Sequence, residues 1–179
     1  MAEIADIGQT DTGCGQGGGV LHSYGVDNQW ITAVTVGASN EITGFTMSDT
    51  GKWGKYTYDD DDAVAAYTET SNDNGTVTQQ LTANFNGLSQ AKIKALNDAK
   101  ACCGTTWVHV LNDGTRIVQG IQVDTAGNWA FANSKAVVRP ASNTQTRTDT
   151  NPIATVNINS EAAQLSVPTT VNDAAIEAL

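Results

Sequence analysis

The chain contains 179 residues, of which 19 are acidic and 9 are basic, so its formal net charge at pH 7 is -10. A chain of this length is the usual size of one domain and can bury a substantial core without disulfide bonds. The acidic excess repels nucleic-acid phosphate and argues against binding of DNA or RNA through a basic surface. Charged residues make up only 16% of the sequence, and the polar character comes instead from Thr, Asn, Ser and Gln, which favours strands and turns over long charged helices.

All of the net charge lies in the first half of the chain. Residues 1–86 contain twelve acidic and two basic residues, whereas residues 87–179 contain seven of each. This division predicts one acidic face rather than a uniformly negative surface.

No apolar run approaches the roughly 18 residues of a membrane span, and the start of the sequence lacks the basic and apolar regions of a signal peptide. We therefore expect neither membrane association nor secretion. The three cysteines, Cys14, Cys102 and Cys103, are an odd number in a chain too large to need disulfide bonds, which favours a reducing compartment. A redox switch between Cys102 and Cys103 stays open.

The composition divides the chain into three parts. Residues 1–19 are predicted to be a flexible arm, because residues 11–19 are too rich in glycine to hold a regular element. Residues 20–160 are predicted to form a β-domain. Residues 161–179 are predicted to be a C-terminal arm that ends in a short helical piece within residues 173–179.

Period-2 alternation of apolar and polar residues predicts most of the β-domain to be strands. Turn residues at 37–40, 71–75 and 112–114 predict hairpins, and residues 142–151 are predicted to be a polar loop. In residues 30–36, alternation places Trp30, Thr32, Val34 and Val36 on one face. The expected strands are residues 30–36, 42–47, 52–58, 64–70, 76–85, 106–111, 117–123, 129–138 and 153–158.

Residues 89–103 are predicted to form a helix, with Ser89 as its N-cap and Gly104 in the left-handed position after its end. Leu88 and Ile93 occupy the positions of a hydrophobic staple at the start of this helix. The fold class expected from these elements is mainly β, with two packed antiparallel sheets in a sandwich or barrel and one flanking α-helix.

The sequence offers little catalytic chemistry. His22 and His109 lie near no nucleophile motif, and a lone histidine on an alternating strand is more often a packed or surface polar residue than a catalytic base. Residues 13–18 match the letters of the dinucleotide-binding pattern G-x-G-x-x-G, but no predicted strand precedes them and no helix follows. The cysteines lack the C-x-x-C spacing of a zinc site. We expect no enzyme activity, no cofactor and no metal site.

The most distinctive acidic feature is the run Asp59, Asp60, Asp61 and Asp62. The run lacks the glycine and the distal glutamate of a calcium-binding loop. A solvated turn is the simplest interpretation. A low-affinity calcium site and a role in an electrostatic contact or an acidic channel remain open.

The order of these elements resembles that of phage tail tube proteins, across residues 14–159. The resemblance is carried by the Cys-Gly arm at 14–19, the hairpin at 30–47 with its ITGFTM run, and the aromatic strand at 53–58. It continues through the strand at 76–85, the helix that begins at Ser89, and the strands 107–111 and 117–123 around an Asn-Asp-Gly turn.

This resemblance implies a structural virion protein that forms hexameric rings, whose inner sheets join into a continuous barrel. The rings stack into a tube through which DNA passes during ejection without specific binding, and a negative lumen suits this passage because it repels phosphate. The candidate lumen or inter-ring residues are Asp59, Asp60, Asp61, Asp62, Thr78, Gln80 and Thr82, with Thr76 and Asn84 on the same predicted face and Val77, Leu81 and Phe85 packed inward.

The implied partners are further copies of the chain, other tail proteins and the passing DNA, and the implied location is the phage tail after synthesis in the bacterial cytoplasm. A capsid decoration module or a fibre-associated β-sandwich is the alternative from a different class of function. The C-terminal arm departs from a minimal tube subunit.

Overall fold

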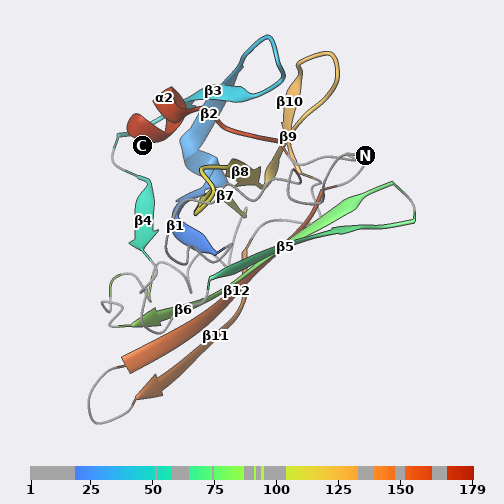
Figure 1. Cartoon of the computed structure of the whole chain (residues 1–179). Helices are drawn as coiled ribbons and strands as arrows, with labels where there is room; N and C mark the ends of the chain where they lie inside the picture. Colours follow the sequence, from blue (N-terminus) through green and yellow to red (C-terminus); the bar gives the residue numbers. More distant parts are fainter. Residues whose placement is uncertain are drawn as a thin grey trace.

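The computed structural model describes residues 19–50, 52–57, 65–73, 75–86, 91, 94, 104–132, 139–147, 152–162 and 169–179. Within these residues the protein is mainly β, and every pair of named strands is antiparallel (Figure 1). The elements are β1 (Val20–Asp27), the 3-10 helix η2 (Asn28–Trp30), β2 (Ile31–Val36), β3 (Ile42–Met47), β4 (Gly54–Thr57), β5 (Ala66–Ser71), β6 (Val77–Asn86), β7 (Thr105–Leu111), β8 (Arg116–Gln119), β9 (Ile121–Val123), β10 (Trp129–Phe131), β11 (Arg139–Arg147), β12 (Pro152–Ala162) and α2 (Asp173–Glu177).

The strands form two four-stranded sheets and two hairpins. The central sheet has the order β4-β1-β7-β8, and the second sheet, called the long sheet below, has the order β11-β12-β6-β5. The strand pairs β2-β3 and β9-β10 are separate two-stranded sheets. The expected fold class of packed antiparallel sheets is confirmed.

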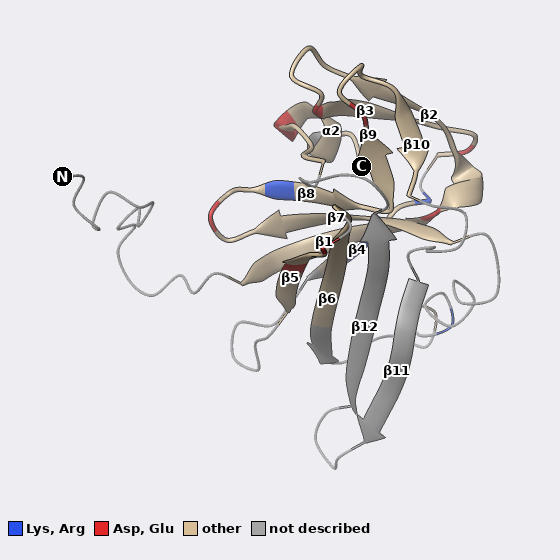
Figure 2. Cartoon of the chain, turned by 90° about the vertical axis from the view of Figure 1, so that its right-hand side faces the viewer, with Lys and Arg blue, Asp and Glu red and all other residues tan. Residues whose placement is uncertain are grey.

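The central sheet is the middle layer of the molecule. In both views β2, β3 and α2 lie on one side of it, and β5 and β6 lie on the other (Figure 1, Figure 2). The burial of β7 agrees with this central position, because every residue from Thr105 to Val110 is buried. A strand that is covered on both faces loses the simple alternation of a half-exposed strand.

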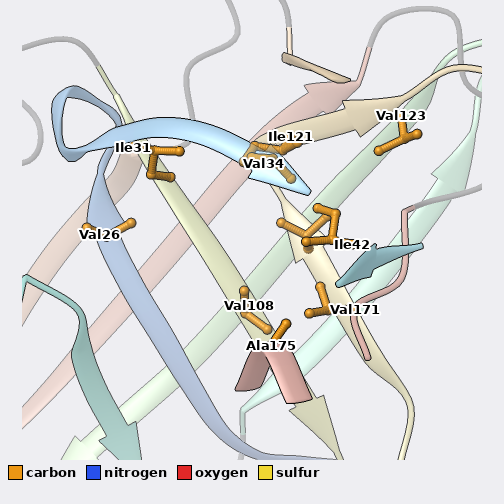
Figure 3. Packing of buried hydrophobic residues seen from close by; sticks show 10 residues of the cluster. Val26, Ile31, Val34, Ile42, Val108, Ile121, Val123, Val171 and Ala175 are labelled. Carbon is orange, nitrogen blue, oxygen red and sulfur yellow. The ribbon is translucent and has the colours of Figure 1, made fainter. Parts of the chain in front are cut away.

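The apolar core lies between the central sheet and the β2-β3 hairpin (Figure 3). Branched aliphatic side chains from four different parts of the chain fill it, which is the packing that β-branched residues favour on pleated surfaces. Its buried members are Val26, Ile31, Val34, Ile42, Val108, Val118, Ile121, Val123, Val171 and Ala175.

Residues 169–172 lie between β3 and β8 and join the β2-β3 hairpin to the central sheet. Ile42 pairs with Val171 in parallel, and Ile117 pairs with Thr170 in antiparallel orientation. α2 then follows, with the Asn172 side chain accepting a hydrogen bond from the Ala175 backbone N–H at 2.9 Å as its N-cap. The expected short helical piece within residues 173–179 is confirmed.

Several local predictions were correct and others were wrong. The hairpins β2-β3, β5-β6 and β7-β8 are confirmed. The polar loop expected at 142–151 is wrong for residues 142–147, which belong to β11. The single strand expected at 117–123 is divided at Gly120, which has φ 109°. Of the predicted helix 89–103, residues 91 and 94 are described, and both are helical; the rest lies outside the described residues.

The face expected for residues 30–36 is also wrong, because the register shifts between Ile31 and Ala33. This bulge buries both Ile31 and Val34 and leaves Thr32 exposed. β1 was not predicted at all, although it is the second strand of the central sheet.

Gly25 lets an aromatic ring lie directly on β1. It pairs with Trp107 of β7, and a Cβ at this position would lie 2.7 Å from Cζ3 of the Trp107 ring. We expect Gly25→Ala to lower the free energy of unfolding by about 1–3 kcal/mol, because a methyl group here overpacks a buried site. Urea denaturation measures this loss.

Gly44→Ala is the matched control for Gly25→Ala. Gly44 also lies in a strand, but its Cβ would meet nothing closer than Thr35 Oγ1 at 3.8 Å, which is ordinary contact. The control variant should unfold at the same urea concentration as the unmodified protein or slightly above it. Equal losses in both variants would contradict the steric explanation.

Candidate functional site

The polar face of β6 is the candidate functional surface. Val77, Gln79 and Leu81 are buried, whereas the alternate residues Thr78, Gln80 and Thr82 lie on the opposite face and reach solvent to different degrees. The alternation expected for this strand is therefore confirmed for residues 77–82. Asn84 and Phe85 belong to β6, but their side chains lie outside the described part.

The same face continues across β5. Thr70, Thr68 and Ala66 pair with Thr78, Gln80 and Thr82, and all three β5 residues are exposed. On the other side of β6, the backbone register pairs Glu161, Asn159 and Asn157 of β12 with the same three β6 residues. We call the described side chains of this surface, Ala66, Thr68, Thr70, Thr78, Gln80 and Thr82, the open face.

The described side chains of the open face offer hydrogen bonds without charge, and the backbone register places one acidic residue, Glu161 of β12, opposite Thr78. The hydroxyl and amide groups of the described side chains donate and accept hydrogen bonds with water, but these side chains include no Lys or Arg to hold phosphate and no aromatic ring on which a base could stack. In Figure 2 the described part of β6 shows neither acidic nor basic residues. Such a surface offers neutral hydrogen-bonding groups to solvent.

β5 and β11 are the outer strands of the long sheet. In the β5-β6 hairpin the Asn72 N–H donates to the Thr76 carbonyl at 2.9 Å. Because pairing alternates along an antiparallel ladder, the backbone groups of Tyr67, Glu69 and Ser71 point away from β6. The bond from the Val20 N–H to the Ala65 carbonyl at 3.2 Å, on this outer side, agrees with this assignment.

Asp59, Asp60, Asp61 and Asp62 lie outside the described residues, so the structure does not place them relative to the open face. Within the described part of the chain, no group of three or more His, Cys, Asp or Glu side chains could hold a metal ion.

A chain of buried polar side chains connects the central sheet to the long sheet behind the open face. Ser23 Oγ lies 2.7 Å from His109 Nδ1, and His109 Nε2 lies 2.7 Å from Gln119 Oε1. Gln119 Nε2 then donates to the Gln79 carbonyl at 3.0 Å. A single histidine within a strand is the one sequence signal of this network.

Gln79 completes the network on the side of the long sheet. Its Nε2 donates to the Val118 carbonyl at 3.1 Å and to the Tyr67 hydroxyl at 2.7 Å. The Gln79 side chain thus binds the backbone of β8, and the Gln119 side chain of β8 binds the backbone of β6. These two bonds fix the position of β6 against β8. Such fully paired buried groups specify one arrangement of two layers.

The hydrogen bonds determine the tautomer of His109. The Gln79 carbonyl can only accept, so the Gln119 amide must direct its nitrogen there and its oxygen toward His109. His109 therefore carries its proton on Nε2, and Nδ1 accepts from the Ser23 hydroxyl. Ser23 and His109 are completely buried, so His109 is a packed polar residue within a strand, which is one of the two alternatives expected from the sequence.

Burial lowers the pKa of His109 to about 4, against a weaker opposing effect of the Gln119 hydrogen bond. Because the unfolded chain binds this proton near pH 6.5 and the folded chain does not, the free energy of unfolding should fall as the pH drops from 6.5 toward 4. The expected loss is roughly 3 kcal/mol. Urea unfolding measured between pH 4 and pH 7.5 checks it.

His22 provides the control for this pH dependence. It is half-buried, and burial followed by the nearby Lys55 charge lowers its pKa. A His22→Gln variant should keep most of the loss of stability between pH 6.5 and pH 4. If the loss disappears with His22 instead, the assignment to His109 is wrong.

In the described part of the chain, no helix is long and apolar enough to cross a bilayer. No family model, no curated protein and no solved structure matches the sequence. The open face and the two outer strands of the long sheet are the features that bear on function.

Proposed function

We propose that this protein is a structural subunit of a phage tail tube, which assembles as stacked hexameric rings around a channel for DNA ejection. The observation that carries the proposal is the long sheet, which combines an uncharged open face with two outer strands. The hexameric ring and the passage of DNA through it are inferred from the resemblance of the sequence to tail tube proteins.

The chemistry of the open face suits a channel lining for DNA. Affinity for a duplex comes mainly from Lys and Arg side chains that neutralise phosphates and release counterions. The described side chains of the open face contain neither residue type, so over β5 and β6 a passing duplex would meet hydroxyl and amide groups such as Thr78 and Gln80. On β11, the backbone register places a single arginine, Arg139, opposite Asn159. The acidic run at 59–62 is proposed to add repulsion in the lumen or to contribute to contacts between rings.

The topology of the long sheet suits a closed ring. Its four strands alternate in direction, so the outer strands β5 and β11 run in opposite directions. In a ring with rotational symmetry, β11 of one copy would therefore pair in antiparallel orientation with β5 of the next. Four strands from each of six copies give about 24 strands, more than the 16–18 strands that already enclose an aqueous channel in porins.

The outer strands also carry few of the features that block pairing between chains. β5 contains one charged residue, Glu69, and no proline. β11 carries its charges at its two ends and has a proline only beside Arg139. Monomeric sheet proteins usually protect such edges with central charges, prolines or bulges. β5 and β11 carry only part of that protection, namely Glu69 in β5 and, in β11, Pro140 and a register shift between Pro140 and Ser142. The remaining length of both outer strands favours a sheet that is continued by another subunit.

Negative-stain electron microscopy of the purified protein tests the proposal. We expect rings with a central channel, or tubes of stacked rings, at micromolar concentration. Discrete small particles at all concentrations would contradict the tube function and favour a capsid decoration or fibre-associated module.

Glu69→Pro tests the outer edge of β5. The N–H of Glu69 points away from β6, so proline removes a hydrogen-bond donor from the edge without removing one from the β5-β6 ladder. We expect this variant to remain folded by circular dichroism but to form no rings in micrographs. Glu69→Gln keeps the N–H and should assemble; rings from Glu69→Pro would exclude pairing through β5.

A further inference from the structure

Residues 169–179, called the closing segment below, occupy a slot between β3 and β8. Five backbone groups of three strands are bonded to this segment. The Ile42 N–H donates to the Thr170 carbonyl at 2.9 Å, and the Asn172 N–H donates to the Ile42 carbonyl at 3.0 Å. The segment therefore acts as an inserted strand for β3.

The other side of the closing segment bonds to β8 and β9. The Val118 N–H donates to the Thr169 carbonyl at 3.0 Å, and the Val171 N–H donates to the Arg116 carbonyl at 3.1 Å. The Val123 N–H donates to the Thr169 hydroxyl at 3.1 Å. An empty slot would leave these groups without their partners, so the fold needs an occupant in the slot.

Side chains add specificity to the backbone pairing. Val171 and Ala175 are buried in the apolar core, where they pack with Ile42 and Val118. Arg116 of β8 forms an ion pair with Asp173 at the start of α2. Together the strand pairing, the two apolar anchors and the ion pair define a segment of fixed sequence and fixed register.

We propose that in the assembled protein this slot is filled by the closing segment of a neighbouring copy, so that each subunit is tied to the next by an exchanged strand. This inference rests on the proposed function, which places copies side by side at high effective concentration. The contacts are the same whichever chain supplies the segment, which is why terminal elements exchange at little cost in free energy.

The position of β12 favours such an exchange. β12 ends at Ala162, and it lies one strand inside the outer strand β11. The proposed ring places the neighbouring copy directly beside β11, so the chain leaves the long sheet near that copy. Six residues, 163–168, separate β12 from Thr169 and can span up to about 20 Å when extended.

A disulfide between Ile117 and Thr170 tests the exchange. The bonds from Val118 to Thr169 and from Val171 to Arg116 flank this pair, which makes it a non-hydrogen-bonded pair with Cα atoms about 4.5 Å apart, close enough for a disulfide. The variant I117C/T170C is made in a chain whose Cys14, Cys102 and Cys103 are replaced by serine. It is assembled and then oxidised with diamide.

Exchange predicts a ladder of covalently linked subunits on a non-reducing gel, and a monomer band alone would overturn it. Assembled single variants I117C and T170C, each oxidised separately, are the controls and should give no ladder. Rings in the micrographs together with a monomer band would leave the tube function standing and remove the exchange. Linked subunits without rings would support the exchange and contradict the tube function.

The buried Ile117 is a risk for folding, so a second measurement uses charge reversal at the Arg116–Asp173 pair. R116D and D173R each place like charges together in a chain on its own. If segments are exchanged, assemblies made from both variants contain slots in which opposite charges meet, and their thermal midpoint should exceed that of either variant alone. A midpoint no higher than that of the separate variants would overturn the exchange.

Discussion

Val171→Asp is expected to cost more than about 4 kcal/mol of unfolding free energy and to leave little folded protein at room temperature. Val171 is 4% exposed and packs in the apolar core between Ile42 and Val118. A carboxylate there would be buried without a partner in the place where the closing segment joins β3 to β8. Urea denaturation followed by tryptophan fluorescence measures the loss.

Thr170→Asp is the matched control, because Thr170 is the adjacent residue of the same strand and is exposed. Its variant keeps the backbone bond to Ile42 and should change the unfolding free energy by less than about 0.5 kcal/mol. If both variants lose the same unfolding free energy, the strand pairing and not the contact with the apolar core is the sensitive feature. If neither variant loses unfolding free energy, the closing segment contributes little to the stability of the fold.

The second large effect is expected for His109→Ala, with a loss of about 3–5 kcal/mol. The substitution leaves a cavity beside Trp107 and Tyr67, whose rings lie 6.5 Å and 5.5 Å from the imidazole. It also removes the hydrogen bonds that His109 makes with the Ser23 hydroxyl and the Gln119 amide oxygen, both of which belong to completely buried residues. Thermal and urea unfolding should both report this loss.

His22→Ala is the control for the second prediction, since His22 is only half-buried and its ring contacts Tyr24 edge-on at 5.4 Å. We expect it to cost less than about 1 kcal/mol. The double variant Ser23→Ala/His109→Leu supplies a further check. This double variant removes the Ser23 hydroxyl together with its partner and fills the cavity, so that only the Gln119 amide oxygen loses its bond to His109. It should be less harmful than His109→Ala, and an equal loss would show that neither the cavity nor the Ser23 hydroxyl explains the effect.

The hairpins and β6 could be predicted because turn residues and the alternation of neighbouring residues determine them. An Asn-Asp-Gly turn at 112–114 supplies Gly114 with φ 85°, and the alternation of residues 77–82 matches one buried and one solvated face. β1 could not be predicted in this way. It is flanked by β4 and β7 in the middle layer, it buries Ser23, and it carries Gly25 where the Trp107 ring needs room.

β11 and the division at Gly120 show where composition misleads. The sequence of β11, RPASNTQTR, has the residues of a loop, but an outer strand tolerates polar side chains and a proline near its end. The strand-like residues 117–123 contain no turn signal other than Gly120, and at this glycine, with φ 109°, the chain leaves β8 and enters β9 of a different sheet. Composition reveals neither the place of β11 at the edge of the sheet nor the backbone angle at Gly120.

The candidate site was partly within reach of sequence analysis. Alternation placed Thr78, Gln80 and Thr82 on one face, but it could not identify Thr68 and Thr70 as their neighbours on β5, because register depends on the hairpin. The buried glutamines Gln79 and Gln119 have no sequence signature, since the backbone carbonyls that they bind across the two sheets are 39 to 40 residues away. The role of the open face as a channel lining remains a proposal.

The pairing of Ile42 with Val171 has a consequence for how the protein folds. These two residues are separated by most of the chain, so the last contact of the apolar core closes a very large loop, and such non-local pairing slows folding. During synthesis the hairpins β2-β3 and β7-β8 can form early, yet the slot between them stays vacant until residue 172 has left the ribosome. The newly made chain therefore passes through a period in which an apolar groove with unsatisfied strand edges is exposed, and in that period it is most vulnerable to aggregation.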